Sequence, residues 1–192
     1  MDHPVGKART PPGRPTTQAL AVVAYWRANS AHWFSKSARF DREFRERFLA
    51  LHQSAARGEL DPWQDSPTGA LALLILLDQY PRNAFRGTSQ MYATDEKARA
   101  IARHAAANDF MAAVEAPLRL FFCLPFAHSE NLADQERSVQ LNARLGPVWK
   151  SHAVGHRDIV RRFGRFPHRN AVLERNTTPA ERAFLDSGGF AG

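Results

Sequence analysis

The stretch ALALLILL, residues 70–77, constrains the fold more than any other part of this chain. It follows Ser66 and Pro67, an N-cap and a first-turn proline that together predict a helix over residues 67–79. Because apolar residues occupy every side of that helix, we expect it in the centre of the molecule, surrounded by other elements. A chain of 192 residues is long enough to bury such a helix in one domain.

The surrounding elements are predicted to be helices as well. Phe40, Phe44 and Phe48 recur at helical spacing in a segment that Gly58 ends. Further helices are expected to begin at capping residues or first-turn prolines: Thr94, Pro117, Asn131, Pro147 and, in a capping box with Glu181, Thr178. Strand patterns are nearly absent. We therefore predict an all-α single domain, residues 19–192, of seven to eight antiparallel helices.

Residues 1–18, MDHPVGKARTPPGRPTTQ, are basic and proline-rich. They are predicted to form a disordered tail and not a secretion signal, since no apolar run follows their charges. No apolar segment reaches the length that spans a bilayer. The single cysteine, Cys123, excludes an internal disulfide and favours a reducing compartment. We expect a cytoplasmic protein with no membrane contact and no cofactor.

The net charge of +7 is concentrated near the C-terminus. Residues 150–175 hold seven Lys or Arg against only Asp158 and Glu174, so we expect partners, solvent or a ligand to offset their repulsion. Nucleic acid is one candidate partner, because Phe163 and Phe166 are interleaved with these cations. No helix-turn-helix or stacking platform accompanies them, which weighs against RNA or DNA binding.

Three prolines follow bulky apolar residues, in Tyr80-Pro81, Leu124-Pro125 and Phe166-Pro167. Helices usually end or kink at such pairs, and each pair is followed at once by polar residues. The first and third corners echo each other, YPRNAF against FPHRNAV. The echo suggests that the chain uses the same physical corner twice.

Three longer blocks carry a family resemblance: LALLILLDQYPRNAFRGT, LPFAHSENLADQERS and HRDIVRRFGRFPHRNAVLERNTTPAE. They resemble the bacterial family known as domain of unknown function 924, over roughly residues 20–190. The resemblance implies a tetratricopeptide-like, all-helical fold and assigns no activity. The chain departs from the family pattern at Asn131, where an acid is usual, and at Cys123, where tyrosine is frequent.

The polar corners suggest a binding module for a small anionic ligand or an acidic peptide end. Arginine suits that task, because its planar fork binds a carboxylate or phosphate through two hydrogen bonds. In the structural alternative, the arginines bind helix carbonyls and the asparagines cap the next turn. The candidate ligand-binding residues are Arg82, Asn83, Arg86, His128, Glu130, His156, Arg165, His168, Arg169 and Asn170.

Catalysis is an alternative function, in which a hydrolase-type enzyme uses His128 and Glu130 beside arginines that stabilise anionic charge. Glu136 is the third catalytic candidate, and pairing of these acids with arginines is the structural alternative. His152 and His156 have metal-ligand spacing, but the glutamate of the HExxH motif is missing, so no metal is predicted. The GxSxG, GxxxxGK[ST] and GxGxxG motifs are absent, which disfavours serine-based and nucleotide-loop chemistry.

Overall fold

The computed structural model describes residues 14–192, and within that range the chain is helical, with no β-strand. The α-helices are α1 (Thr17–Ala28), α2 (Ala38–Arg57), α3 (Pro67–Leu74), α4 (Tyr80–Ala84), α5 (Asp95–Ala107), α6 (Leu124–Ala127), α7 (Leu132–Ala143), α8 (Pro147–Phe163) and α9 (Pro179–Asp186). The 3-10 helices are η1 (Ser30–His32), η2 (Asp61–Asp65), η4 (Ser89–Tyr92), η5 (Phe110–Ala113), η6 (Ala116–Phe122) and η7 (Pro167–Arg169). A π-helical turn, η3 (Ile75–Gln79), joins α3 to α4.

The all-α, single-domain prediction is confirmed. Because α3, η3 and α4 run on without a break, they form one central helix, and residues 14–192 then contain eight α-helices. The prediction of seven to eight is therefore confirmed as well. The predicted tail over residues 1–18 lies largely outside the described residues, and α1 begins at Thr17. Among residues 14–192, no helix combines the length and the apolar character needed to cross a membrane.

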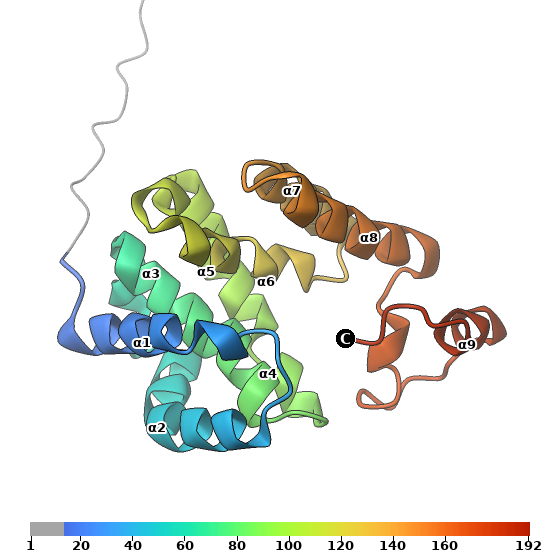
Figure 1. The fold of residues 1–192 in the computed structure, drawn as a ribbon, viewed down its shortest axis with the longest axis horizontal. Helices are drawn as coiled ribbons and strands as arrows, with labels where there is room; N and C mark the ends of the chain where they lie inside the picture. The colour runs from blue at the N-terminus through green and yellow to red at the C-terminus, as the bar shows by residue number, and fades with distance from the viewer. Residues whose placement is uncertain (1–13) are drawn as a thin grey trace, which may run out of the picture.

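The central helix is buried as the sequence predicts. Residues 70–77 are at most 1% exposed, and Ser66 caps the helix by accepting a hydrogen bond from the Gly69 N–H (3.1 Å). Aromatic residues of α1 and α2 pack beside it, with the rings of Trp26 and Phe44 5.3 Å apart. Figure 1 shows α1, α2 and α5 gathered around this helix in one body, while the α7–α8 pair and α9 lie beyond it.

The central helix does not end at Tyr80-Pro81, so the prediction of a corner there was wrong. Proline has no N–H and its ring clashes with the preceding turn, which usually breaks an α-helix. Here the helix widens into the π turn instead, and the Tyr80 N–H donates to the Ile75 carbonyl five residues back. Turns of this kind insert one extra residue and often mark functional sites.

The π turn leaves carbonyl groups that other helices use. The Leu76 carbonyl accepts from His52 Nδ1 of α2 (2.9 Å), and the Leu77 carbonyl accepts from Thr94 Oγ1 (2.6 Å), just before α5. Thr94 was predicted to cap α5, but its hydroxyl makes no capping bond and serves the central helix. Buried carbonyls need such partners, so the irregular turn fixes how α2 and α5 pack against the centre.

Several local predictions hold and one is corrected. Asn131 caps α7, Gly58 ends α2 with a φ of 89°, and Thr178 forms a capping box with Glu181. The segment predicted as a helix from Pro117 is mainly the 3-10 helix η6, followed by the single turn α6.

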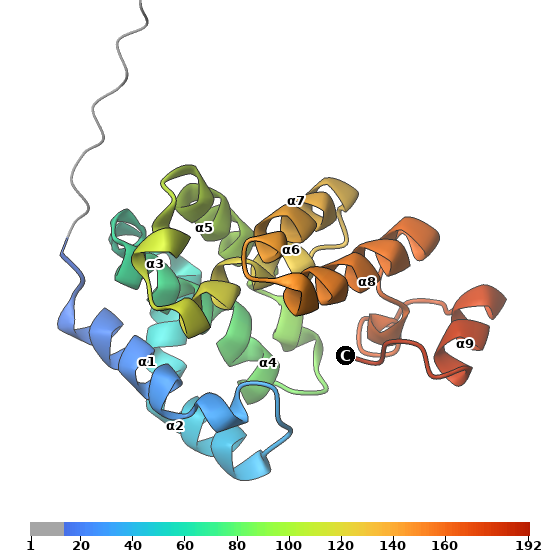
Figure 2. The same cartoon turned by 45° about the horizontal axis from the view of Figure 1, so that its top comes forward.

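Helices α7 and α8 form an antiparallel pair beside α6, as Figure 2 shows. Pairs of this kind are the units of helical repeat proteins. The tetratricopeptide-like arrangement of the whole chain stays a prediction. After α8 the chain passes through η7 to α9, and the last residues return toward the middle of the molecule (Figure 1).

We expect Leu74→Ala to reduce the free energy of unfolding by about 2–5 kcal/mol, because it empties space in a fully buried helix. Leu74 is 0% exposed, whereas Leu20 is 49% exposed, so Leu20→Ala is the matched control and should cost little. Urea unfolding of both variants measures the difference. Equal costs would show that the 70–77 helix is not the packing centre.

We expect Thr94→Val to destabilise the fold by about 1–3 kcal/mol, because valine keeps the shape but leaves the Leu77 carbonyl without its side-chain donor. Thr88→Val is the control, since the Thr88 hydroxyl bonds to the Phe85 carbonyl (2.8 Å) at an exposed turn. Thermal unfolding compares the two. If Thr88→Val costs as much as Thr94→Val, the hydroxyl at position 94 has no special role at the π turn.

Candidate functional site

A polar pocket of about 480 Å³ lies where three segments meet. One wall is the start of α5 with the end of η4, the second is the connection from α6 to α7, and the third is the segment after η7. Its lining residues are Tyr92, Ala93, Asp95, Glu96, Arg99, His128, Ser129, Glu130, Asn131, Arg169, Leu173 and Arg175. Pockets that gather charged and titratable groups are the default candidates for function.

Asp78, on the π turn, is 1% exposed. It lies beside this pocket, at the centre of a network of charged and polar side chains. One carboxylate oxygen accepts from His128 Nδ1 (2.7 Å) and lies 3.2 Å from the Arg82 guanidinium. The other accepts from Gln79 Nε2 (2.6 Å). Burial raises the pKa of Asp78, but Arg82 and His128 outweigh that effect and lower it to about 2. Asp78 is therefore an ionised, fully paired carboxylate.

The arginines of the two echoing motifs meet at a second carboxylate, that of Asp95. Arg82 binds Asp95 through both terminal nitrogens (2.8 and 3.0 Å) and also donates to the Asp78 backbone carbonyl (2.9 Å). Arg169 donates to the His128 carbonyl (2.8 Å) and lies 3.9 Å from Asp95. Each arginine thus binds a backbone carbonyl, as the structural alternative requires, and both reach one acid at the pocket.

Arg169 is the more weakly paired of the two arginines. It is 6% exposed, its Nε has no hydrogen-bond partner among the described residues, and its guanidinium lies over the rings of Tyr92 (4.6 Å) and Phe166 (4.7 Å). Burial, followed by repulsion from Arg82, lowers the pKa of Arg169. A buried guanidinium with an unused donor is costly unless a ligand or water satisfies it.

Glu130 belongs to the second wall of the pocket and joins it to the third through Arg175. Its carboxylate accepts from both terminal nitrogens of Arg175 (2.9 Å each) and from the Phe166 backbone N–H (2.9 Å). Burial raises the pKa of Glu130, yet these donors outweigh it and the pKa is lowered. Because both oxygens are engaged with strong donors, Glu130 is poorly suited to accept a proton from a substrate.

Other candidate residues do not reach the pocket. Arg86 binds Asp41 through two hydrogen bonds (2.9 and 3.1 Å), and Arg165 binds Glu181 in the same manner (2.6 and 2.9 Å). Glu136 pairs with Arg161 (2.8 Å) at an exposed site. The two candidate asparagines serve local structure: Asn83 donates to the Gln79 carbonyl (2.9 Å) and Asn170 to Thr177 Oγ1 (3.4 Å).

His156 and His168 lie behind the pocket wall, against Phe166 and under Phe190. The ring centroids of Phe190 lie 4.6 Å from His156 and 5.1 Å from His168. Burial, followed by repulsion from neighbouring cationic groups, lowers the pKa of each histidine to about 4. Within residues 14–192, no group of three or more His, Cys, Asp or Glu side chains could hold a metal ion.

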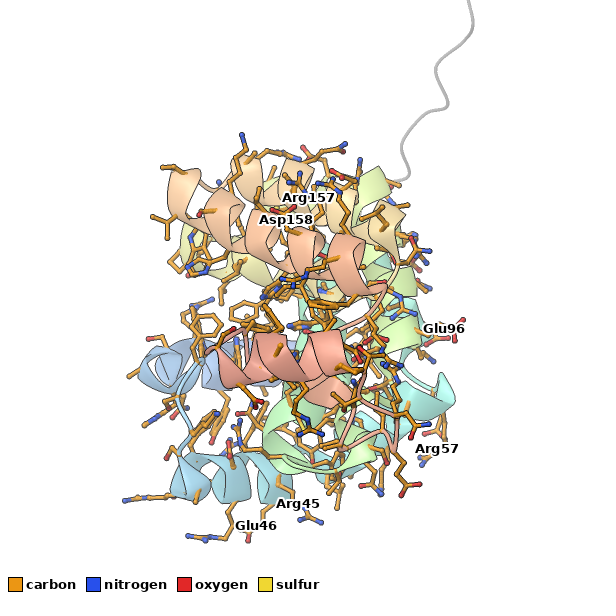
Figure 3. The ribbon with its side chains drawn as sticks, turned by 90° about the vertical axis from the view of Figure 1, so that its right-hand side faces the viewer. Arg45, Glu46, Arg57, Glu96, Arg157 and Asp158 are labelled. Carbon is orange, nitrogen blue, oxygen red and sulfur yellow. The ribbon has the colours of Figure 1, made fainter. Side chains whose placement is uncertain are left out.

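The excess of cations in residues 150–175 is mostly neutralised by acids from other parts of the chain. Five of the seven cations have carboxylate partners, which include Asp95, Glu130, Glu136, Asp158 and Glu181. Arg157 and Asp158 lie together on the outer face of α8 (Figure 3). The expectation that the cations need an outside partner was therefore wrong for most of them, because distance along the chain does not measure distance in space.

Several residues of the site were not among the sequence candidates, and they include Asp78, Tyr92, Asp95, Arg99 and Arg175. For Asp78 the signal was present, since a lone carboxylate following an apolar run must be paired if that run is buried. Asp95 and Arg175 had no comparable signal. Nothing in the local sequence distinguishes them from ordinary helix-start and surface residues.

We expect the free energy of unfolding to fall as the pH drops from about 6.5 to about 4.5. The reason is that His156 and His168, whose pKa is about 4 in the folded chain, accept protons more readily when unfolded. The full loss is about 3 kcal/mol per histidine, since each pKa unit corresponds to about 1.4 kcal/mol. His156→Phe should reduce the slope, which urea unfolding at several pH values measures.

Val148→Phe is the control for that experiment, because Val148 is 63% exposed on the same helix and carries no titratable group. It should leave the slope unchanged. A stability that stays flat across this range, or a slope equal in wild type and His156→Phe, would contradict the assignment of two neutral buried histidines.

Comparison with known proteins places the chain among bacterial proteins. Among solved structures it is similar to a protein of unknown function, ATU0120, from Agrobacterium tumefaciens. The two share 50% sequence identity with a TM-score of 0.86, and the likeness covers 89% of this chain and 98% of that one. No curated protein matches the chain. The model of the bacterial protein family of unknown function DUF924 matches residues 22–189, and the chain belongs to that family.

Proposed function

We propose that the pocket binds the carboxylate or phosphate group of one small anionic ligand. The observation that carries this proposal is Arg169, which lines the pocket, is 6% exposed and keeps an unpartnered Nε. Its nearest carboxylate, Asp95, lies at 3.9 Å and is already bound through both oxygens by Arg82. The Nε atom is enclosed, but the terminal nitrogen that lies 3.9 Å from Asp95 makes no hydrogen bond to the described residues either, so Arg169 keeps a donor for a ligand oxygen. Its planar fork suits a carboxylate or phosphate.

Arg99 adds a second cation to the same pocket. Its Nε lies 3.6 Å from Asp134, a distance too long for a good hydrogen bond. Asp134 is already bound by Arg103 (2.8 and 3.0 Å) and by the Ser129 hydroxyl (2.8 Å). Two arginines thus share the Asp134 carboxylate, and Glu96 is the other acid on this side of the pocket. The acid Glu96 extends outward at the edge of the molecule (Figure 3).

The pocket suits a small ligand better than an extended one. Its volume of about 480 Å³ is in the usual range for small-molecule sites. A carboxylate at the end of an acidic peptide offers the same chemistry and is the alternative source of the anion. Nucleic acid is a weaker proposal, because only Lys150 and Arg162 in residues 150–175 have no carboxylate partner among the described residues. The buried thiol of Cys123 supports a cytoplasmic location.

We expect phosphate to raise the melting temperature of the wild-type protein above its value in chloride at matched ionic strength. Ligand stabilisation grows as RT ln(1 + [L]/Kd), about 1.4 kcal/mol at a tenfold excess over Kd. Arg169→Gln should abolish the phosphate effect, and Arg99→Gln should weaken it, as thermal shift and isothermal calorimetry measure. Matched chloride removes general screening as an explanation.

Arg103→Gln is the control, since Arg103 binds the same Asp134 but does not line the pocket. It should retain the phosphate effect even if it lowers the melting temperature. Equal melting temperatures in phosphate and in matched chloride for the wild-type protein would refute the anion site. If an acidic peptide stabilises the protein and phosphate does not, the ligand is larger than proposed.

A further inference from the structure

His128 is held in one orientation at the pocket. Its Nδ1 lies 2.7 Å from a carboxylate oxygen of Asp78, so Nδ1 carries the proton and donates it to that oxygen. Its side chain is 18% exposed and lines the pocket, and Nε2 has no hydrogen-bond partner among residues 14–192. A neutral imidazole in this state presents a free lone pair on Nε2.

Asp78 is a firm support for that orientation. It is 1% exposed, and Gln79 and Arg82 hold its position from two other directions. The His128 backbone is fixed as well, because its carbonyl accepts from Arg169 (2.8 Å). A carboxylate that orients a histidine, which in turn faces an open site, is the arrangement by which proteins set up a general base.

We propose that the pocket hydrolyses a small ester that carries a carboxylate or phosphate group, with His128 as the general base and Asp78 as its positioning residue. This inference rests on the proposed anion site, since Arg169 and Arg99 would hold the anionic group. Two other side chains near His128 that could act as base or nucleophile are already hydrogen-bonded. Glu130 is bound by Arg175 and the Phe166 N–H, and the Ser129 hydroxyl donates to Asp134 (2.8 Å). Water is therefore the nucleophile.

The reaction needs no reagent other than water. As the water oxygen bonds to the ester carbonyl carbon, one O–H bond breaks and its proton moves to His128 Nε2. The carbonyl oxygen becomes negatively charged as the electron pair of the C=O bond moves onto it. When the carbonyl reforms, the bond to the alcohol oxygen breaks and Nε2–H returns the proton to that oxygen. The products are one carboxylic acid and one alcohol.

Charge around His128 favours its neutral form. Burial is the largest cause that lowers the pKa of His128, and the positive charge of Arg82 is the next, against the opposing effect of Asp78. The other titratable or charged groups close to it from the neighbouring elements are Asp95, Arg169, His156 and His168. The base is thus unprotonated at neutral pH, and the rate should fall as the pH decreases.

The test uses a p-nitrophenyl ester of succinate, which keeps one free carboxylate, and p-nitrophenyl acetate, which has none. We expect the wild-type protein to hydrolyse the succinate ester faster than the acetate. His128→Gln should lower kcat at least about a hundredfold. Asp78→Asn should lower kcat more than it raises KM and should shift the pH profile. Glu136→Gln, on the outer face, should change nothing.

A second measurement separates this inference from the anion site. Diethyl pyrocarbonate modifies neutral, accessible imidazoles, and mass spectrometry reports each histidine separately. We expect modification of His128 that phosphate slows, while exposed His152 reacts equally with and without phosphate. If His128 reacts but phosphate does not protect it, the anion site fails. If phosphate protects His128 but the protein hydrolyses neither ester, or His128→Gln hydrolyses as well as wild type, the hydrolase inference is overturned.

Discussion

A buried carboxylate, that of Asp78, is the constraint on which the rest of this structure depends. Removing an ionised carboxylate from water is very costly unless charges and hydrogen bonds replace the lost solvation. Arg82, Gln79 and His128 supply those partners, and His128 comes from fifty residues further along the chain. The central helix is therefore not only an apolar centre. It also carries one charged group that a distant segment must satisfy.

The pairing of Asp78 also brings the two arginine motifs together. Arg82 binds both Asp78 and Asp95, so Asp95 pairs only weakly with Arg169. A backbone carbonyl and two aromatic rings hold Arg169 instead. Because there are too few free carboxylates here for both arginines, some N–H donors of Arg169 make no hydrogen bond within residues 14–192. The structural role of Arg169 and its proposed role in binding are thus linked, because the carbonyl bond that fixes Arg169 also limits its pairing with acids.

Much of the fold could be predicted from local patterns. The apolar run at 70–77 and the capping box at Thr178 act through neighbouring residues, so the sequence alone reveals them. Pro81 misled the prediction, because the strain of a proline can be relieved by a π turn whose freed carbonyls find partners far away. The ion pairs of residues 150–175 could not be predicted from local patterns either, since most of the acids that pair with its cations lie elsewhere in the chain. The sequence alone indicates that Asp78 needs a partner, but the identity of its partners depends on the tertiary fold.

Hydrogen exchange of Asp78→Asn, followed by mass spectrometry, tests most directly whether this carboxylate organises the site. We predict faster exchange in residues 124–131 and 165–175, with unchanged protection in α1 and in residues 70–77. Asp158→Asn, at an exposed ion pair on α8, is the control and should leave both regions protected. Unchanged exchange around His128 and Arg169, or an equal loss of protection throughout the chain, would contradict the central role of Asp78.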